Sequence, residues 1–318
     1  MRHASDVRHH SWGDNQTMNI GYVGLGNMGG ALAKRIQRQF PLSVYDLSPS
    51  AVQSLVELGS NSCATLAELA SSCDVILLCL PTSNHVRKAL FGDGGLASTA
   101  KAGALIIDQT TGDPIATRAM ANDLAKLGIE LIDAPVSGGA QGAEAGTIAI
   151  MVGADPEQYA RALPVLNAIS SSVFYAGEIG SGQVIKLVNN MLSGALRLLT
   201  FEGIALAAKN GIEPHKACEI LLAGGAKSTF LEKFMAAHII NGRLETGFTL
   251  GLMHKDVRLA CQLGEDSGVP MFFGNVAREF YQMCINEMGA DAQVHSAALV
   301  VDRISHTAVV PAAGIHLA

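Results

Sequence analysis

A glycine-rich turn between a short apolar run and an amphipathic stretch constrains this fold more than any other feature. Residues 20–23 are apolar and residues 31–39 have helical spacing; between them lies Gly24-Leu25-Gly26-Asn27-Met28-Gly29. A G-x-G-x-x-G turn with a strand before it and a helix after it is typical of a dinucleotide site. Its first glycine permits the bend, its second lets backbone approach a pyrophosphate, and its third allows helix–strand packing. The N-terminus of the helix offers free N–H groups to the phosphates.

An acidic residue follows at the spacing expected for a ribose contact. Asp46 ends the second strand candidate, about 20 residues after the first glycine. A carboxylate there binds the ribose 2′-hydroxyl and repels a 2′-phosphate, and no arginine follows in residues 47–49 to receive one. We therefore expect NAD rather than NADP. The alternative is that Asp46 only caps the helix that starts near Ser48.

Strand and helix signals alternate in the first half of the chain, and strand signals then stop. The strand candidates are residues 19–23, 42–45, 75–80, 105–108, 130–132, 148–152 and 173–175. The helix candidates between them are residues 31–39, 50–58, 84–91, 114–127 and 156–168. Further helical patterns follow at residues 183–209, 215–223, 229–239, 252–267, 275–288 and 292–305.

This alternation predicts a parallel sheet with helices on both faces. The expected fold class is α/β, with an N-terminal Rossmann domain (a doubly wound parallel sheet) followed by an all-α domain. We place the NAD-binding domain at residues 18–180 and the all-α substrate and oligomerisation domain at 181–318. The polar residues 1–17 are expected to be a disordered extension.

Composition excludes several classes of protein. The chain has 318 residues, of which 49% are hydrophobic and 16% charged, so a wholly disordered chain is excluded. Its net charge of −6 argues against a nucleic-acid partner, and polar residues interrupt the apolar stretch 187–208, so no membrane segment is predicted. The six scattered cysteines and the polar N-terminus indicate reduced thiols in a cytoplasmic protein. No metal site is predicted.

A second glycine-rich element, residues 133–139, follows a strand candidate and so lies at the carboxyl edge of the sheet. Ser137 offers a hydroxyl, and Gly138 and Gly139 offer consecutive backbone N–H groups. Together these donors could hold a substrate carboxylate. A loop bent by glycine only for packing is equally compatible with the pattern.

Lys186 and Asn190 are four residues apart and project from one face of a predicted helix. A lysine among apolar neighbours usually extends its ammonium to water. Beside a cationic nicotinamide ring, however, desolvation and repulsion would both favour the neutral amine, which suits a proton shuttle. Asn190 could hold the lysine or a substrate oxygen in line.

Taken together and in this order, the motifs resemble the β-hydroxyacid dehydrogenase family of the 6-phosphogluconate dehydrogenase superfamily. The resemblance runs from about residue 18 to residue 303. It rests on residues 20–29, 80–83, 133–139 with Gly142, Gly146 and Thr147, 180–190 and 255–256.

The resemblance implies a role for each matching residue. It places Leu80 and Pro81 in the loop beneath the cofactor, and it implies cofactor contacts for Thr111 and Lys255. Substrate carboxylate binding falls to Ser137, Gly138 and Gly139. Lys186 becomes the catalytic acid/base with Asn190 assisting, and Asp256 is expected to support its helix.

This chain departs from the family pattern at three positions. Thr110 replaces the more usual serine, His85 stands where some members have a cofactor-binding asparagine, and His254 precedes Lys255. A contact between His85 and the cofactor is therefore in doubt. His254 is expected to be a structural histidine rather than a substrate contact.

The implied activity is a reversible, NAD-dependent hydride transfer from a small β-hydroxy acid, which gives a semialdehyde or keto acid. The resemblance also implies a homodimer or homotetramer. Three alternatives fit the motifs less well. An imine reductase typically lacks the lysine, and a 6-phosphogluconate dehydrogenase needs a longer helical domain. A catalytically silent NAD-binding module would be expected to have lost Lys186 or the Ser137 loop.

Overall fold

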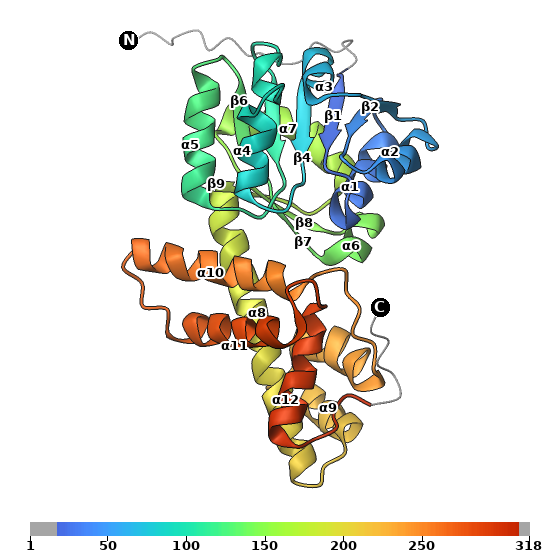
Figure 1. Ribbon diagram of the computed structural model, residues 1–318, viewed down its shortest axis with the longest axis vertical. Helices are drawn as coiled ribbons and strands as arrows, with labels where there is room; N and C mark the ends of the chain where they lie inside the picture. The colour runs from blue at the N-terminus through green and yellow to red at the C-terminus, as the bar shows by residue number, and fades with distance from the viewer. Residues whose placement is uncertain (1–17, 312–318) are drawn as a thin grey trace, which may run out of the picture. The chain divides into compact units, whose positions relative to one another are not determined.

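The computed structural model describes residues 18–311 and divides the chain after Lys186 into two compact units (Figure 1). Unit 1 contains every named strand of the described chain. These are β1 (Ile20–Val23), β2 (Leu42–Tyr45), β3 (Asn61–Ser62), β4 (Val75–Leu78), β5 (Leu105–Asp108), β6 (Glu130–Asp133), β7 (Val136–Ser137), β8 (Ala149–Gly153) and β9 (Val173–Gly177).

Seven α-helices alternate with these strands. They are α1 (Asn27–Gln37), α2 (Pro49–Val56), α3 (Leu66–Ser72), α4 (Ser83–Phe91), α5 (Pro114–Ala125), α6 (Gly139–Ala145) and α7 (Pro156–Ile169), with a 3-10 turn at Leu96–Ser98. Helix α8 (Ser181–Lys209) begins in unit 1 and continues into unit 2.

The strands form one sheet in the order β3-β2-β1-β4-β5-β6-β8-β7, and β9 pairs with β8. Strand β1 pairs in parallel with both β2 and β4, so the chain changes direction across the sheet at this point. Ligands of open α/β sheets bind at the carboxyl ends of the strands beside such a switch point. The predicted parallel sheet is confirmed for β1 to β6, whereas β8 runs antiparallel to β6 and β7.

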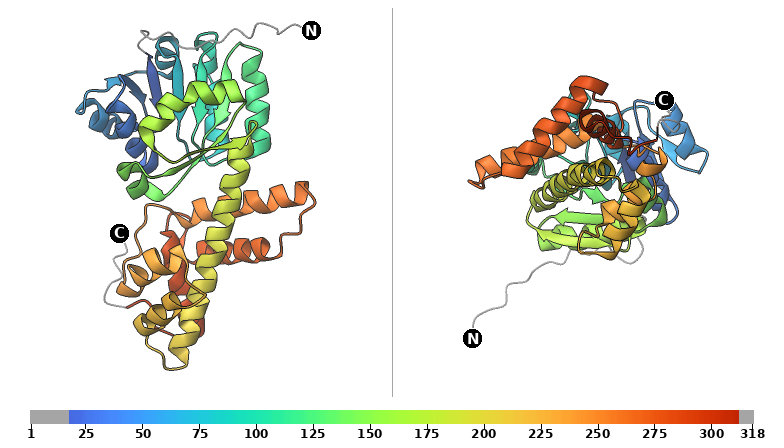
Figure 2. Two further views of the ribbon diagram at one scale, coloured as in Figure 1. Left: turned by 180° about the vertical axis from the view of Figure 1, so that it is seen from behind. Right: turned by 90° about the horizontal axis from the view of Figure 1, so that it is seen from below.

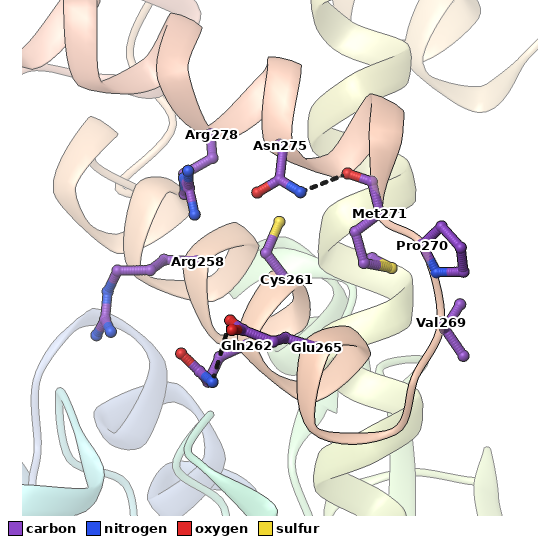
Figure 3. Close-up of a pocket in the computed structure, with 9 residues that line it drawn as sticks. All are labelled: Arg258, Cys261, Gln262, Glu265, Val269, Pro270, Met271, Asn275 and Arg278. Atoms are coloured by element: carbon purple, nitrogen blue, oxygen red, sulfur yellow. Dashed lines mark hydrogen bonds between the residues drawn. The ribbon is translucent and has the colours of Figure 1, made fainter.

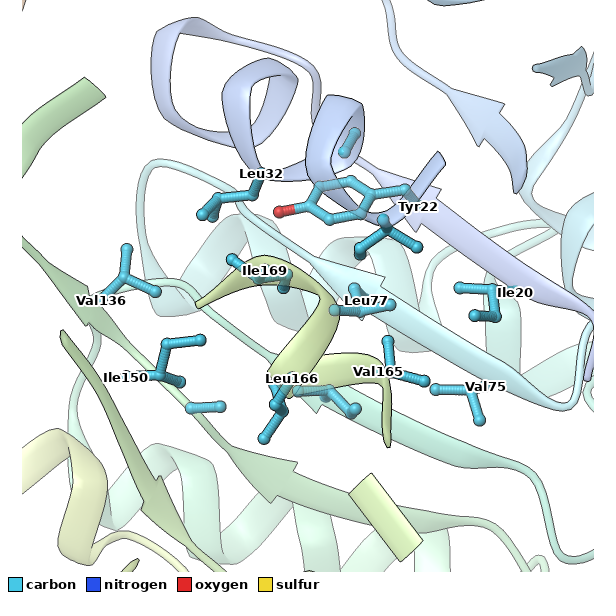
Figure 4. Packing of buried hydrophobic residues seen from close by; sticks show 14 of the residues in the cluster. Ile20, Tyr22, Leu32, Val75, Leu77, Val136, Ile150, Val165, Leu166 and Ile169 are labelled. Atoms are coloured by element: carbon cyan, nitrogen blue, oxygen red, sulfur yellow. The ribbon is translucent and has the colours of Figure 1, made fainter. Parts of the chain in front are cut away.

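Helices cover both faces of the sheet, as the alternation predicted. One apolar cluster joins the sheet to α1, α6 and α7, and a second cluster joins it to α3, α4 and α5. Figure 2 (left) shows α7 in yellow-green over the first face, and Figure 4 shows Tyr22 of β1 beside Leu32 of α1 and Ile169 of α7. These side chains are fully buried, so the core fixes α1 against the strand that precedes the glycine-rich turn.

Unit 2 is helical. Besides most of α8 it contains α9 (Pro214–Ala223), a π-helix (Leu231–Ala236), a 3-10 turn (Ile239–Asn241), α10 (Leu250–Asp266), α11 (Phe272–Met288), a second 3-10 turn (Val294–Ser296) and α12 (Ala297–Ser305). Helix α8 is the one described helix long and apolar enough to cross a membrane by length and composition. Its Leu198, Phe201 and Ile204 are buried in the core of unit 2, as in many helices of globular proteins.

The structure differs from the predicted elements in a few places. Helix α1 begins at Asn27, inside the glycine-rich turn, and helices α3 and α6 were not predicted. The predicted helix 229–239 contains a π-helical segment. The two compact units meet after Lys186, because the first turn of α8 is bonded to the sheet of unit 1. The expected extension, residues 1–17, lies outside the described residues.

Candidate active site

Each glycine of the turn has the geometry that its predicted role requires. Gly24 has a φ of +91°, and a Cβ there would overlap the Cys79 carbonyl oxygen. A Cβ at Gly29 would overlap the Gly24 carbonyl oxygen, so α1 packs closely on the turn. A Cβ at Gly26 would meet no atom within 4 Å, which leaves open space in front of α1. The turn therefore fits a pyrophosphate approaching the backbone at Gly26.

Asp46 follows β2 and braces this turn. Its Oδ2 accepts a hydrogen bond of 2.6 Å from the backbone N–H of Leu25, and its Oδ1 accepts one of 2.7 Å from that of Ser48. Ser48 is the N-cap of α2. The helix is thus capped by Ser48 and not by Asp46, which holds the N–H of that capping residue and stands beside the glycine-rich turn.

The loops after β4 and β5 are bonded to each other. The backbone N–H of Leu80 donates to Thr110 Oγ1 over 3.0 Å, and the Thr110 N–H donates to Asp108 Oδ1 over 2.9 Å. Threonine retains the hydroxyl of the usual serine at this position. The departure at Thr110 therefore keeps an oxygen that accepts the hydrogen bond from Leu80. Pro81 and Thr111 lie in the same two loops, Pro81 exposed and Thr111 half-buried.

The His85 ring contacts the N-cap of α4. Its ring Nδ1 lies 2.8 Å from Oγ1 of Thr82, the N-cap of α4. The histidine therefore stabilises the start of α4 together with that threonine.

The Ser137 loop needs glycine at both positions that follow. Gly138 has a φ of +143° and Gly139 a φ of +70°, in the region that side chains disfavour. A Cβ at Gly138 would press on Ile148, whereas one at Gly139 would meet no atom within 4 Å. Gly138 thus has a packing role, and Gly139 at the start of α6 faces open space where an anion could approach.

Asp133, at the end of β6, binds the N-terminus of α8. Its Oδ1 accepts from the backbone N–H of Gly180 over 2.6 Å, and its Oδ2 accepts from that of Gln183 over 2.7 Å. Burial raises the pKa of this carboxyl to about 6 despite the two bonds. A Cβ at Gly153 or at Gly182 would overlap the carboxylate, so both glycines leave room for it.

Lys186 follows this anchor by less than one helical turn and is 7% exposed. A lysine that extends its ammonium to bulk water would be far more exposed. The burial therefore favours the proton-shuttle interpretation over the solvated one.

In unit 2, Asp256 connects two predicted site residues. The Asn190 side-chain amide donates from Nδ2 to Asp256 Oδ2 over 2.6 Å, and Lys255 Nζ forms an ion pair of 3.0 Å with Asp256 Oδ1. Asn190 is 7% exposed and the Asp256 side chain 2%. We expected Asp256 only to support its helix; in the structure it also orients Asn190 of α8 and Lys255 of α10.

Comparison with known proteins covers nearly the whole chain. A family model described as the NAD-binding domain of 6-phosphogluconate dehydrogenase matches residues 19–177. A second, described as NAD-binding of NADP-dependent 3-hydroxyisobutyrate dehydrogenase, matches residues 180–301.

Curated relatives agree. The chain is 34% identical over 268 residues to 2-(hydroxymethyl)glutarate dehydrogenase of Eubacterium barkeri. This match covers 84% of this chain and 89% of that protein. The chain is also 35% identical over 272 residues to 3-hydroxyisobutyrate dehydrogenase of Pseudomonas aeruginosa. That match covers 83% of this chain and 91% of the relative. The chain belongs to the β-hydroxyacid dehydrogenase family. It is a nicotinamide-dependent oxidoreductase that acts on a CH–OH group.

Solved structures agree with this assignment. The 3-hydroxyisobutyrate dehydrogenase of Mycobacterium tuberculosis with L-serine superposes with a TM-score of 0.80 at 25% identity, covering 90% of this chain and 99% of that one. An imine reductase of Streptomyces aurantiacus, at 20% identity and a TM-score of 0.59, shares the fold alone.

Two further residues of this β-hydroxyacid dehydrogenase escaped the sequence analysis. The glycine-rich element 133–139 gives no sign of a role for the Asp133 carboxylate, and no local pattern marks Gln183, although both residues hold the start of α8. Their partners lie dozens of residues away, and no local spacing reports such a contact. Burial, with Arg258 and Arg278 nearby, lowers the pKa of His254, so its neutral form is favoured.

Two cavities of the dehydrogenase lie away from these residues. One of about 280 Å³ lies between α10 and α11; Figure 3 shows Arg258 and Arg278 on its walls with Cys261 between the two helices. Another, of about 640 Å³ in unit 1, is lined by residues that include Glu130 and Tyr175. Neither includes a candidate site residue. Within residues 18–311, no group of three His, Cys, Asp or Glu side chains could hold a metal ion, and all six cysteines are free.

Proposed function

We propose that this dehydrogenase reversibly oxidises a small β-hydroxy acid with NAD to a semialdehyde or keto acid. The substrates named for two relatives, 3-hydroxyisobutyrate and 2-(hydroxymethyl)glutarate, share a hydroxymethyl group next to a carboxylate-bearing carbon. L-serine, named with the Mycobacterium tuberculosis structure, has the same unit. A substrate of the form HOCH2–CH(R)–COO⁻ is therefore the chemistry that these names have in common.

The observation that carries the proposal is the burial of Lys186 at the anchored start of α8. In the oxidative direction its neutral amine takes the proton of the substrate hydroxyl. In the reductive direction its ammonium returns that proton to the carbonyl oxygen. When bound, the nicotinamide accepts or supplies the hydride.

The other candidate residues bind and orient. The Ser137 hydroxyl and the backbone N–H groups of Gly138 and Gly139 hold the carboxylate, and the Asn190 amide holds the reacting oxygen in line with Lys186. We assign Lys255, which is paired with Asp256, to a contact with the nicotinamide.

The dinucleotide is held by three parts of unit 1. These are the turn Gly24–Gly29 with Asp46, the loop at Leu80 and Pro81, and the turn that contains Thr111. We favour NAD because the Asp46 carboxylate stands at the end of β2, where it would repel a 2′-phosphate.

We also propose a cytoplasmic homodimer or homotetramer without a nucleic-acid or membrane partner. Leu192, Leu199 and Leu206 of α8 are between 59% and 67% exposed, and burial between copies would remove these apolar side chains from water. Light scattering should give a mass of at least two chains at micromolar concentration; a monomer would contradict this part.

A substrate panel tests the proposed activity. NADH and NADPH formation are measured with 3-hydroxyisobutyrate, 2-(hydroxymethyl)glutarate, L-serine and 3-hydroxypropionate. We expect NADH formation with at least one of them and weaker activity with NADP. If no compound is oxidised although the dinucleotide binds, the chain is a silent NAD-binding module.

A further inference from the structure

The Gln183 side chain spans two parts of the candidate site. It is fully buried. Its Oε1 accepts a hydrogen bond of 2.8 Å from the backbone N–H of Gly112, and its Nε2 donates one of 2.7 Å to the carbonyl oxygen of Thr110. Both ends of the amide are therefore bonded to the turn after β5, on either side of Thr111.

The backbone of the same residue is bonded to a different strand. The Gln183 N–H donates to Asp133 Oδ2 at the end of β6. One residue thus bonds the first turn of α8 to the end of β6 and to the loop that follows the neighbouring strand β5. Lys186 follows three positions later, which corresponds to about 4.5 Å along the helix axis.

We infer that Gln183 is a positioning residue of the dehydrogenase: it sets the place of Lys186 relative to the turn Thr110–Gly112, where the dinucleotide is proposed to bind. The inference rests on the proposed function. Because a helix moves as a rigid element, a displacement of its first turn displaces Lys186 too. A misplacement of about 1 Å can lower a rate by 10²-fold.

The turn after β5 has other anchors. Thr110 is held by Asp108 and by the Leu80 N–H, and the Asp113 N–H donates to Ser83 Oγ over 2.9 Å. Loss of the Gln183 amide therefore leaves the dinucleotide-binding turn in place. The first turn of α8 keeps its backbone bonds to Asp133 but loses its direct side-chain bonds to the turn Thr110–Gly112. The defect should appear in kcat and not in the dinucleotide Kd.

Gln183→Met tests this inference because methionine keeps the length and approximate volume of glutamine but makes neither hydrogen bond. We expect kcat to fall about 10- to 100-fold with the NADH Kd changed less than threefold. The pH dependence of kcat should also shift, since Lys186 would leave its present surroundings. Gln37→Met is the matched control: it removes an amide bond to the Leu55 carbonyl oxygen in the same unit and should leave kcat unchanged.

Gln183→Glu is the second variant, and it keeps the inference testable if the methionine variant fails to fold. When protonated, a glutamic acid can accept from Gly112 and donate to Thr110 as glutamine does; when ionised it can only accept. Its kcat relative to wild type should therefore rise as the pH is lowered. A merely structural role would lower the melting temperature without this pH-dependent recovery.

Two results overturn the inference: a folded Gln183→Met enzyme with wild-type kcat and pH profile, or a loss confined to the dinucleotide Kd. Failure of the proposed function would look different, because the wild-type enzyme itself would oxidise no substrate. In that case the Lys186 amine is acetylated with acetic anhydride across a pH series and quantified by mass spectrometry. An unchanged labelling profile in Gln183→Met would then also overturn the inference.

Discussion

The side-chain amide of Asn190 donates a 2.6 Å hydrogen bond to the Asp256 carboxylate, and this bond joins α8 to α10 inside unit 2. The other carboxylate oxygen pairs with Lys255. A buried carboxylate with an amide on one oxygen and an ammonium beside the other has fixed partners on both sides. Asn190 and Lys255 are thereby oriented by a residue that we do not expect to touch the substrate.

Asp256→Asn should disturb both partners while keeping the shape of the side chain. Lys255 loses its counter-charge, and Asn190 faces an amide that accepts through only one of its two polar atoms. We expect kcat/KM for the best hydroxy acid to fall about 10- to 100-fold, the range of a lost hydrogen bond to a charged group. Asp266→Asn, at the exposed end of α10, is the control. Equal kinetics in the two variants would show that Asp256 has no orienting role.

Lys186→Ala should lower kcat about 10²- to 10⁴-fold, which is the usual contribution of a positioned acid/base group. Dinucleotide binding, measured by NADH fluorescence, should persist because the glycine-rich turn is unchanged. Lys209→Ala, on the same helix with an exposed side chain, should retain full activity. Near-normal turnover by the Lys186 variant would refute its assignment as acid/base.

Asp46→Asn should shift the cofactor preference toward NADP. The asparagine oxygen can still accept the hydrogen bond from Leu25, but the negative charge that would repel a 2′-phosphate is gone. We expect the ratio of kcat/KM with NADP to that with NAD to rise about tenfold, equivalent to about 1.4 kcal/mol. An unchanged melting temperature would show that the hydrogen bonds from Leu25 and Ser48 to this side chain are kept. An unchanged ratio in a folded variant would mean that Asp46 does not face the ribose.

His295 should make the protein sensitive to acid. Burial, with Arg197 and His238 nearby, lowers its pKa to about 3, whereas the unfolded chain titrates near 6.5. The unfolded state therefore binds more protons between these values, so the stability contributed above pH 6.5 is lost as the pH falls toward 3. The loss between pH 7.5 and pH 5 should be about 2 kcal/mol.

Urea unfolding at these two pH values measures this loss. His295→Phe keeps an aromatic ring against Phe230 and Phe234 and should lose about 2 kcal/mol less than wild type over this interval. His215→Phe, at an exposed position on α9, should behave as wild type. Equal losses in wild type and in His295→Phe would mean that His295 titrates normally.

The sequence predicted most of the fold because its signals are local. Apolar runs and helical spacing identify β1, α1 and the alternation that follows, and the glycine-rich turn lies where a strand meets a helix. Helix α6 was missed because Gly139–Ala145 is composed of small and polar residues without apolar periodicity.

The site was predictable only in part. The spacing of Lys186 and Asn190 was evident, but whether the lysine is buried or solvated depends on packing that local sequence does not contain. Gln183 and Asp256 act on residues 66 to 73 positions away, and only the folded chain brings these partners together.

The close packing around the Asp133 carboxylate limits which substitutions homologous sequences can accept. Gly153 and Gly182 cannot gain a methyl group while the aspartate remains, and the aspartate cannot be lost without freeing two buried amides. Three positions scattered over 50 residues should thus be inherited as one unit. Distant homologues in which the glycine-rich motifs have drifted could still be recognised by this trio.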